Sequence, residues 1–346
     1  MKLYAFVAAI AFCLSVATVN AQYDFTEVGK RMDAAKKELG GGAVALIVKD
    51  GKIIYKKESE DPEFSTKTAV PIGVSSQWLT AALVMTFVDE GLLKLDDKVS
   101  DYLPIFKTYG KGYITIRHCL TNFTGVEAPT GVGSIFDKKN YPTLEEEVNS
   151  YANKHEIQTN PGTEFRFTSI GLNIAGRVCE VISKKKMFDR LMLERITRPC
   201  GMRTTTFYNN EKALSPNNGA QASATDYINF LTMIMSNGMF NGKRVLSEKS
   251  IAEMQTIVTT PAIIKYAPEA AKGFSYGLGE WIQEVDSQGN PAVISSPSFT
   301  GVYPYIDKCR NYACVFVVKS ELKDAKLNFY NSLKNMIDGV IGGECK

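Results

Sequence analysis

Histidine is scarce in this chain, and cysteines with metal-binding spacing are absent. The 346 residues include only two histidines, His118 and His155, and no two cysteines form a Cys-x-x-Cys pair. Structural zinc sites take cysteine and histidine ligands with such spacings, so the sequence predicts no metal and no cofactor. Gly273-Phe-Ser275-Tyr-Gly277 matches the nucleophile elbow of α/β-hydrolases. That catalytic triad needs a later histidine, and none follows residue 155.

Strong charge is missing as well. The formal net charge is +3 at pH 7, which gives no indication of a nucleic-acid or anionic membrane surface. The one long apolar run, in residues 1–21, follows Lys2 and ends in the small residues Val19-Asn20-Ala21. This pattern predicts a cleaved signal peptide, a mature N-terminus at Gln22, and a secreted or periplasmic protein without a membrane span. Oligomeric state is left open by the sequence.

The cysteines that follow the signal segment favour disulfide bonds. Cys13 lies in that segment, and the other six of the seven cysteines follow it. An even number in an exported chain favours disulfides, although six cysteines allow 15 connectivities. Cys309 and Cys314 bracket a short turn between two strand-like runs, so we predict a disulfide between them. The alternative for Cys119 and Cys179 is a buried thiol, because both lie in apolar helical surroundings.

A buried helix is predicted between residues 71 and 91. Nearly every position from Trp78 to Val88 is apolar, which is typical of a helix buried on all sides. About eleven apolar residues are too few to span a bilayer. Ser75 or Ser76 is expected to cap the start of this helix with its hydroxyl, and Gly91 is expected to end it.

Strand patterns lie toward both ends of the chain. They cover residues 43–48, 53–57, 274–284, 299–306 and 312–318, with helices expected at 23–39 and 324–341. Asp50-Gly51 joins the first two strands and is a strong hairpin signal. Strands at both ends with helices between them predict an α+β fold, with one antiparallel sheet built jointly by the two ends. The expected division is a signal peptide at 1–21, a sheet region at 22–70 and 265–346, and a mainly helical region at 71–264.

Several motifs carry a resemblance to a known family. The segment Ile72–Pro104, IGVSSQWLTAALVMTFVDEGLLKLDDKVSDYLP, resembles the active-site segment of the penicillin-binding protein and class C β-lactamase-related serine hydrolases. Similar motifs follow in the family's order at residues 114–125, 161–165, 276–279 and 299–307. Each motif is weak alone, but their common order argues against chance. The resemblance implies a sheet covered by terminal helices, an all-helical region beside it, and a cleft between the two.

All three motifs that supply this family's chemistry are altered here. In the family, a nucleophilic serine and a lysine three residues later begin the buried helix, and these positions hold Val74 and Gln77. A serine nucleophile needs such a base to take its proton. The family's Tyr-x-Asn motif falls on Phe167 and Ser169, and its Lys/His-Thr-Gly motif falls on Ser296-Pro297-Ser298. The resemblance therefore implies a pseudoenzyme.

Shifting the motif by one residue does not restore the chemistry, since no lysine lies three residues after Ser75 or Ser76. We expect a secreted non-catalytic protein that binds a ligand or protein partner through the altered cleft. Two alternatives stay open: a serine hydrolase of the esterase, β-lactamase or D-amino-acid peptidase type with a rearranged site, and a purely structural extracellular protein. The candidate cleft residues are Ser75, Ser76, Gln77, Asn122, Ser169 and Ser298.

Asn122-Phe123-Thr124 is the one glycosylation sequon after the signal segment. The resemblance places this loop near the rim of the cleft. A glycan on Asn122 would shield the site from large substrates in a glycosylating host, whereas an unmodified loop is expected in a bacterium.

Overall fold

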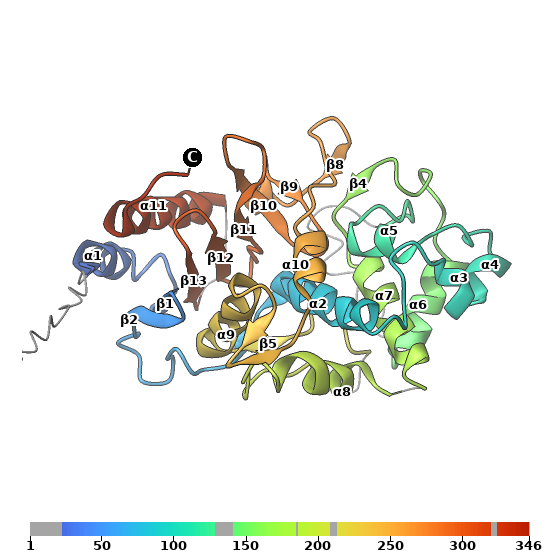
Figure 1. Cartoon of the computed structure of the whole chain (residues 1–346), viewed down its shortest axis with the longest axis horizontal. Helices are drawn as coiled ribbons and strands as arrows, with labels where there is room; N and C mark the ends of the chain where they lie inside the picture. Colours follow the sequence, from blue (N-terminus) through green and yellow to red (C-terminus); the bar gives the residue numbers. More distant parts are fainter. Residues whose placement is uncertain (1–22, 129–140, 185, 208–212, 320–323, 346) are drawn as a thin grey trace, which may run out of the picture.

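The computed structural model describes residues 23–128, 141–184, 186–207, 213–319 and 324–345. Its main feature is a seven-stranded sheet with the order β2-β1-β13-β12-β11-β10-β9, in which all neighbours are antiparallel (Figure 1). The strands are β1 (Ala43–Lys49), β2 (Lys52–Lys57), β9 (Ser275–Tyr276), β10 (Trp281–Val285), β11 (Pro291–Ser295), β12 (Val302–Asp307) and β13 (Tyr312–Val318). The predicted α+β fold, with one sheet built from both ends of the chain, is confirmed. The predicted domain boundaries stay a prediction.

Helices cover both faces of the sheet, because its central strands are apolar on both sides. In β13, Val315 and Val317 belong to the core that contains α2 (Ser76–Asp89) and α9 (Ala224–Met235). Cys314 and Phe316 belong to the core under α1 (Thr26–Ala34) and α11 (Asp324–Ile341). Figure 1 shows α1 and α11 together on one side of the sheet. The predicted terminal helix is confirmed, whereas the predicted first helix is longer than α1.

The hairpin and the following strands show where local sequence decides the structure and where it does not. Asp50 and Gly51 have φ angles of 52° and 72°, as a tight two-residue hairpin turn requires, and they join β1 to β2. The strand predicted at 274–284 is instead two antiparallel neighbours, β9 and β10. Gly279 turns the chain between them with a φ of 79°, and a Cβ there would lie 2.5 Å from the Cβ of Ala81. Contact with α2 therefore divides the predicted strand.

The predicted buried helix is α2, which follows the 3-10 turn η1 (Gly73–Ser75) and is buried from Ser76 to Phe87. Gly91 adopts the left-handed conformation just beyond the end of α2, as predicted. The expected capping role of Ser75 or Ser76 was wrong, since neither hydroxyl accepts a hydrogen bond from the first turn. The Ser76 hydroxyl donates to the carbonyl of Gly73 at 2.6 Å, a local bond that short hydroxyl side chains readily form.

The remaining elements form a mainly helical region beside the sheet, in which α7 packs against α2. Within the described ranges, no helix is long and apolar enough to cross a membrane. The helices are α3 (Val99–Tyr102), α4 (Ile105–Thr108), α5 (Ile116–Leu120), α6 (Leu144–Asn153), α7 (Ile170–Ile182), α8 (Phe188–Met192), η3 (Leu193–Thr197), α10 (Glu248–Met254) and η4 (Glu269–Ala271). The two-stranded ladders are β3 (Val70–Pro71) with β5 (Gln221–Ala222), β4 (Phe165–Arg166) with β8 (Ile264–Tyr266), and β6 (Met239–Phe240) with β7 (Lys243–Arg244).

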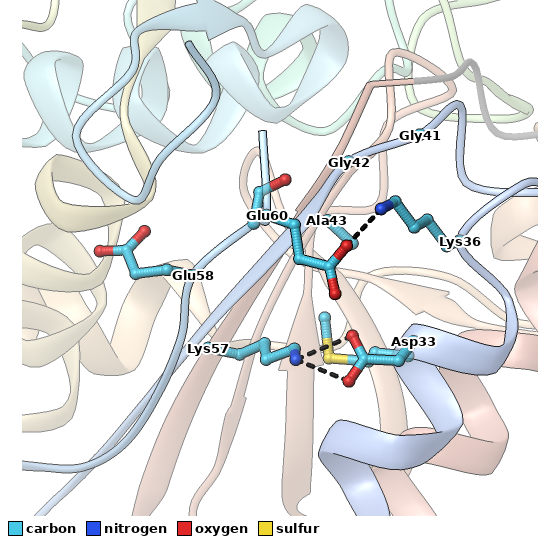
Figure 2. Close-up of a pocket in the computed structure, with 10 residues that line it drawn as sticks. Asp33, Lys36, Gly41, Gly42, Ala43, Lys57, Glu58 and Glu60 are labelled. Atoms are coloured by element: carbon cyan, nitrogen blue, oxygen red, sulfur yellow. Dashed lines mark hydrogen bonds and ion pairs between the residues drawn. The ribbon is translucent and has the colours of Figure 1, made fainter. Parts of the chain in front are cut away.

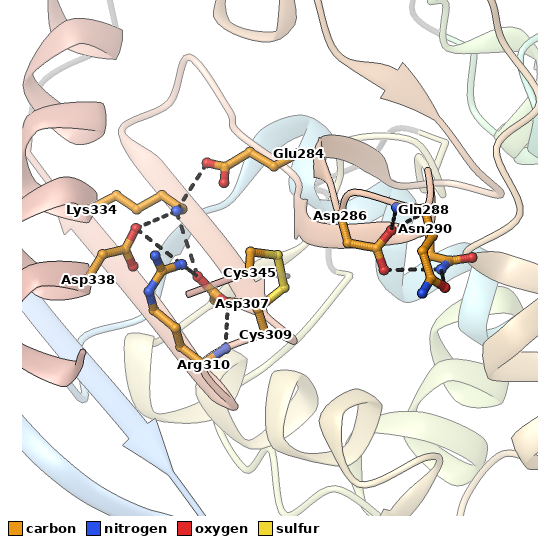
Figure 3. The surroundings of a disulfide bond; sticks show 10 residues. All are labelled: Glu284, Asp286, Gln288, Asn290, Asp307, Cys309, Arg310, Lys334, Asp338 and Cys345. Carbon is orange, nitrogen blue, oxygen red and sulfur yellow. Dashed lines mark hydrogen bonds and ion pairs between the residues drawn. A yellow bond between two sulfur atoms is a disulfide. The ribbon is translucent and has the colours of Figure 1, made fainter. Parts of the chain in front are cut away.

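The disulfide joins Cys309 to Cys345, so the predicted Cys309–Cys314 pair was wrong (Figure 3). Cys314 lies within β13, opposite Tyr305 of β12, and is a buried thiol. Cys309 lies in the turn beyond that ladder, where the chain after α11 reaches it. The expectation that all six cysteines form disulfides was also wrong. The buried free thiols are Cys119, Cys179, Cys200 and Cys314.

Candidate functional site

The first turn before α2 and the segment between β11 and β12 form two sides of the candidate site. The Ser75 hydroxyl donates to the carbonyl of Ser296 at 2.5 Å. Gly73 has a φ of 52°, and a Cβ there would lie 2.4 Å from Oγ of Ser298. Only glycine allows this close approach. The structure therefore brings the turn that carries Val74 against the positions of the altered third motif.

Gln77 is held inside the protein by three neutral side chains. Its Nε2 donates to Oδ1 of Asn217 at 2.6 Å, and its Oε1 accepts from the Tyr276 hydroxyl at 2.7 Å. Nδ2 of Asn122 donates to the same hydroxyl at 3.0 Å and lies 3.4 Å from the Gln77 oxygen. Gln77 is only 1% exposed. A buried amide with both ends hydrogen-bonded is stable where an unpaired one would be costly.

The hydrogen bonds continue from Gln77 into the helical region. Oδ1 of Asn173 accepts from the backbone N–H of Asn217 at 3.0 Å, and its Nδ2 donates to Oε1 of Glu147 at 3.1 Å. The Tyr151 hydroxyl donates to that same Glu147 oxygen at 2.5 Å. Burial raises the pKa of Glu147 and raises the pKa of Tyr151 well above its usual value. A buried polar path therefore links α2 through α7 to α6.

The positions of the altered second motif lie beside this path. The ring of Phe167 packs against Trp281, with centroids 5.1 Å apart, and against Tyr276 at 6.0 Å. Oδ1 of Asn122 accepts from the backbone N–H of Thr168 at 3.1 Å, which ties the two loops together. Ser169 lies near the Tyr151 hydroxyl. Phe167 thus fills an aromatic cluster without a hydroxyl of its own.

Most of the predicted cleft residues are buried. Val74, Phe167 and Ser169 are partly exposed. The fully buried positions are Ser75, Ser76, Gln77, Asn122, Ser296 and Ser298. The polar atoms of these buried cleft candidates bond to one another and to the backbone.

The sequon residue Asn122 lies within this buried network. Its side chain is 3% exposed, and its Nδ2, the atom that would carry a glycan, donates to Tyr276. A glycan at this atom is incompatible with the folded structure. The predicted shielding role of a glycan at the cleft rim is therefore wrong.

Neither serine of the first turn has a base among its hydrogen-bond partners. Val74 has no hydroxyl, and the Ser75 and Ser76 hydroxyls both donate to backbone carbonyls, which cannot act as bases. Burial raises the pKa of Tyr276 well above its usual value, so this phenol stays protonated. A proton acceptor for acyl transfer needs a pKa near the working pH. The Ser75 and Ser76 hydroxyls therefore tie backbone segments together.

Neither a metal site nor a ligand pocket is formed by the charged side chains beside α1. In the part of the chain that the structure describes, no group of three or more His, Cys, Asp or Glu side chains could hold a metal ion. A recess beside α1 is bordered by the ion pairs Lys36–Glu60 and Lys57–Asp33 (Figure 2). Its volume of about 20 Å³ is close to that of a single water. This recess is too small for an organic ligand.

Sequence reasoning named Asn122 as a cleft residue but missed the other two partners of Gln77. Tyr276 belongs to a motif that carried the resemblance, but its contact with residue 77 crosses 199 positions. Asn217 lies in an irregular segment and is 140 positions away. Asn173, which accepts from the N–H of Asn217, also lies outside the motifs. Only the position of Tyr276 in a family-like motif could have drawn attention to it.

Known proteins are similar to this chain in sequence. The D-alanyl-D-alanine-carboxypeptidase/endopeptidase AmpH of Escherichia coli (strain K12) is 23% identical over 98% of this chain and 95% of its own length. Protein flp of Staphylococcus aureus (strain MW2) is 26% identical over 48% of this chain, and the match spans only 34% of flp.

Solved structures and a family sequence model also match this chain. The putative beta-lactamase from Bacteroides dorei DSM 17855 has a TM-score of 0.81 and 27% identity, over 92% of this chain and 99% of that one. EstCE1, a hydrolase with promiscuous acyltransferase activity, has a TM-score of 0.75 over the same shares, and its 18% identity shows the shared fold alone. The model of the Beta-lactamase family matches residues 32–334. This protein therefore belongs to the Beta-lactamase family.

Proposed function

We propose that this protein is a non-catalytic member of its family that keeps the fold for binding rather than for acyl transfer. The observation that carries this proposal is the pair Val74 and Gln77. The position of the nucleophile has no hydroxyl, and the position of the base is a neutral amide with both ends hydrogen-bonded. Loss of one member of a nucleophile–base unit can lower kcat on the order of 10⁶-fold. Here both members are replaced.

A second observation supports the same proposal. The network around Gln77 is neutral, and the hydroxyl of Tyr276 donates into it. A lysine at position 77 would place an ammonium beside the donor nitrogen of Asn122 in a buried site. Burying a charge without a counter-charge is costly. The surroundings of residue 77 thus favour an amide.

The binding surface in this proposal is the partly exposed rim of the altered site. Val74, Phe167 and Ser169 reach this rim, together with Phe299 and Thr300 from the segment between β11 and β12. The rim therefore offers aromatic and aliphatic contacts beside a few hydroxyls. We place this function outside the cytoplasm because of the signal-like residues 1–21. N-terminal sequencing of the exported protein should begin at Gln22.

Turnover assays test the non-catalytic proposal. Purified protein is incubated with nitrocefin, p-nitrophenyl butyrate and a peptide ending in D-alanyl-D-alanine. We expect rates no higher than those of the Ser75→Ala and Ser76→Ala variants, because neither hydroxyl has a base. Turnover that is lost in either variant, with an unchanged melting temperature, would return this chain to the serine hydrolases.

The relatives favour a serine hydrolase with a rearranged site as the second candidate. The matching observation is Ser169, which is partly exposed and lies near Tyr151, whose hydroxyl donates to Glu147. A carboxylate could then accept the serine proton through the phenol. Turnover that is abolished by Ser169→Ala but kept in Ser75→Ala would select this candidate.

A further inference from the structure

We propose that the groove between α10 and the β10–β11 turn is a second binding site, which takes a small ligand with one carboxylate and a short apolar chain. The groove lies away from Val74 and Gln77, and none of the residues that line it belongs to the altered motifs. The proposal is therefore independent of whether the altered site hydrolyses a substrate.

The groove is open to solvent and has both apolar and polar walls. Its volume of about 480 Å³ leaves room for a small ligand that stays partly exposed. Ile251 and Ile257 from α10 and the loop after it, with Pro291 across the groove, supply the apolar wall. Lys308 and Thr256 supply polar groups beside them. The arrangement fits a ligand with one polar end and one apolar end.

Lys308 supplies the charge that selects an anion. Its Nζ donates to Oε1 of Gln255 at 2.7 Å, and among the described residues it forms no ion pair with a carboxylate. Desolvation by the surrounding protein lowers the pKa of Lys308, against the charges of Glu280 and Asp286. An ammonium with a neutral partner at the wall of a groove gains from a carboxylate placed beside it.

The nearby acid Glu280 does not satisfy Lys308. Glu280 is fully buried beside the indole of Trp78, and it forms no ion pair with Lys308 among the described residues. Burial raises the pKa of Glu280 to about 8, so the group is mostly neutral at pH 7. The positive charge of Lys308 is therefore available to a ligand.

A second acid restricts the ligand to one negative charge. Glu248 lies at the wall of the groove and pairs at 3.5 Å with Arg244, which does not line it. A second negative group on the ligand would meet this carboxylate rather than another cation. A monocarboxylate thus fits better than a phosphate ester, whose charge at neutral pH exceeds one.

Both walls of the groove are held in place before a ligand arrives. Oδ1 of Asp286 accepts from the backbone N–H groups of Gln288 and Asn290 at 2.9 and 2.8 Å, which orders the β10–β11 turn (Figure 3). On the other wall, the N–H of Leu278 donates to the carbonyl of Met254 at 2.8 Å. Binding to such a preformed site costs little ordering entropy.

The test follows the methyl groups of Ile251 and Ile257 by NMR in isoleucine-labelled protein. Hexanoate is the probe, hexanamide is its uncharged counterpart, and inorganic phosphate is the alternative anion. We expect hexanoate to shift both methyl signals saturably, with a Kd on the order of millimolar for so small a ligand. Hexanamide should bind at least about tenfold more weakly than hexanoate, since it lacks the charge-assisted bond to Lys308.

Variants assign the effect to the ammonium. Lys308→Gln should weaken hexanoate binding about tenfold, while Lys308→Arg should keep it within a few-fold. Lys67→Gln, a matched change at an exposed lysine outside the groove, should leave binding unchanged. Absence of a saturable shift, equal binding to the Lys308→Gln protein, or phosphate binding as tight as that of hexanoate would overturn the proposal.

Discussion

Two buried polar clusters on this protein differ in charge. The cluster around Gln77 contains only neutral groups, and hydrogen bonds satisfy both ends of the amide. The cluster around Lys334, beside the disulfide, is ionic: Nζ of Lys334 lies 2.7 Å from Asp338 and 3.1 Å from Glu284 (Figure 3). Lys334 is only 3% exposed. The fold therefore tolerates a buried lysine where acids surround it.

The difference explains why the altered site is neutral. At Lys334, burial disfavours the charge, but the hydrogen bond and charge of Asp338 hold its pKa above the usual value. At Gln77, the neighbouring groups are Asn217, Tyr276 and Asn122, and none of them carries a negative charge. A buried charge is thus present at Lys334, where ion pairs connect α11 to the sheet. It is absent at Gln77, where the family's chemistry requires a lysine.

Replacing Lys334 should give the largest effect. In Lys334→Met the carboxylates of Asp338 and Glu284 lose a buried cation, while Arg310 still pairs with Asp307. Breaking a buried pair costs roughly 3–5 kcal/mol of unfolding free energy, and we expect a loss near the lower value. Urea denaturation measures this loss. The control Lys272→Met removes an exposed pair with Glu269 and should change the stability by less than about 1 kcal/mol. Equal effects of the two changes would show that the Lys334 cluster is not a structural clamp.

Removing the disulfide should give the next largest effect. Cys309→Ser opens a loop with a sequence separation of 36 residues, and loss of such a crosslink typically costs about 2–4 kcal/mol. Denaturation of the oxidised protein measures the loss, and peptide mapping without reduction should recover Cys309 linked to Cys345. Recovery of Cys309 linked to Cys314 would restore the pairing that the sequence predicted.

A change at Gln77 tests the neutral cluster. Gln77→Leu leaves the Tyr276 hydroxyl and the Asn217 carbonyl without their partner, and a buried unsatisfied group costs about 1–3 kcal/mol. The exposed change Gln288→Leu is the control and should have little effect on stability. Denaturation curves of both variants give the comparison. A Gln77→Leu protein as stable as the parent would show that the network does not support the fold.

Glu280 links the stability of the folded protein to pH. The change in stability over one pH unit should be the smallest of the expected effects. Burial raises its folded-state pKa from 4.5 to about 8, while Lys308 and Trp78 act the other way. Between these values the unfolded state releases the proton and the folded state keeps it, so stability falls as pH rises. The slope is at most about 1.4 kcal/mol per pH unit.

The Glu280→Gln variant isolates the contribution of Glu280 titration to stability. Its amide does not titrate, so its stability relative to the parent should increase between about pH 6 and about pH 7 by roughly 1 kcal/mol. Below the unfolded-state value near 4.5, the difference should be constant. A difference that is constant across the whole range would show that Glu280 titrates normally.

The fold could be predicted from the sequence where local patterns decide it. Neighbouring residues decide three such features: the turn at Asp50-Gly51, the burial of α2 on all sides, and the bounds of α11. The break between β9 and β10 could not be predicted, because it depends on the contact of Gly279 with Ala81. The partner of Cys309 was missed for the same reason, since α11 brings Cys345 back from a distance.

The candidate site could be predicted only in part. Val74, Gln77 and Phe167 were identified by their motif positions. Sequence could not show that Ser75 and Gln77 are buried, because their burial depends on Ser296, Asn217 and Tyr276 from distant segments. The sequence therefore left open whether these groups face an open cleft, and the structure shows that they hydrogen-bond within the protein.

Covalent labelling tests the central claim most directly. The purified protein is incubated with a fluorescent penicillin and, separately, with a fluorophosphonate, and its intact mass is then measured. These probes report a serine whose proton has an acceptor. The account predicts an unchanged mass with both probes. A stoichiometric adduct at Ser75, Ser76 or Ser169, lost in the corresponding alanine variant without a lower melting temperature, would contradict it.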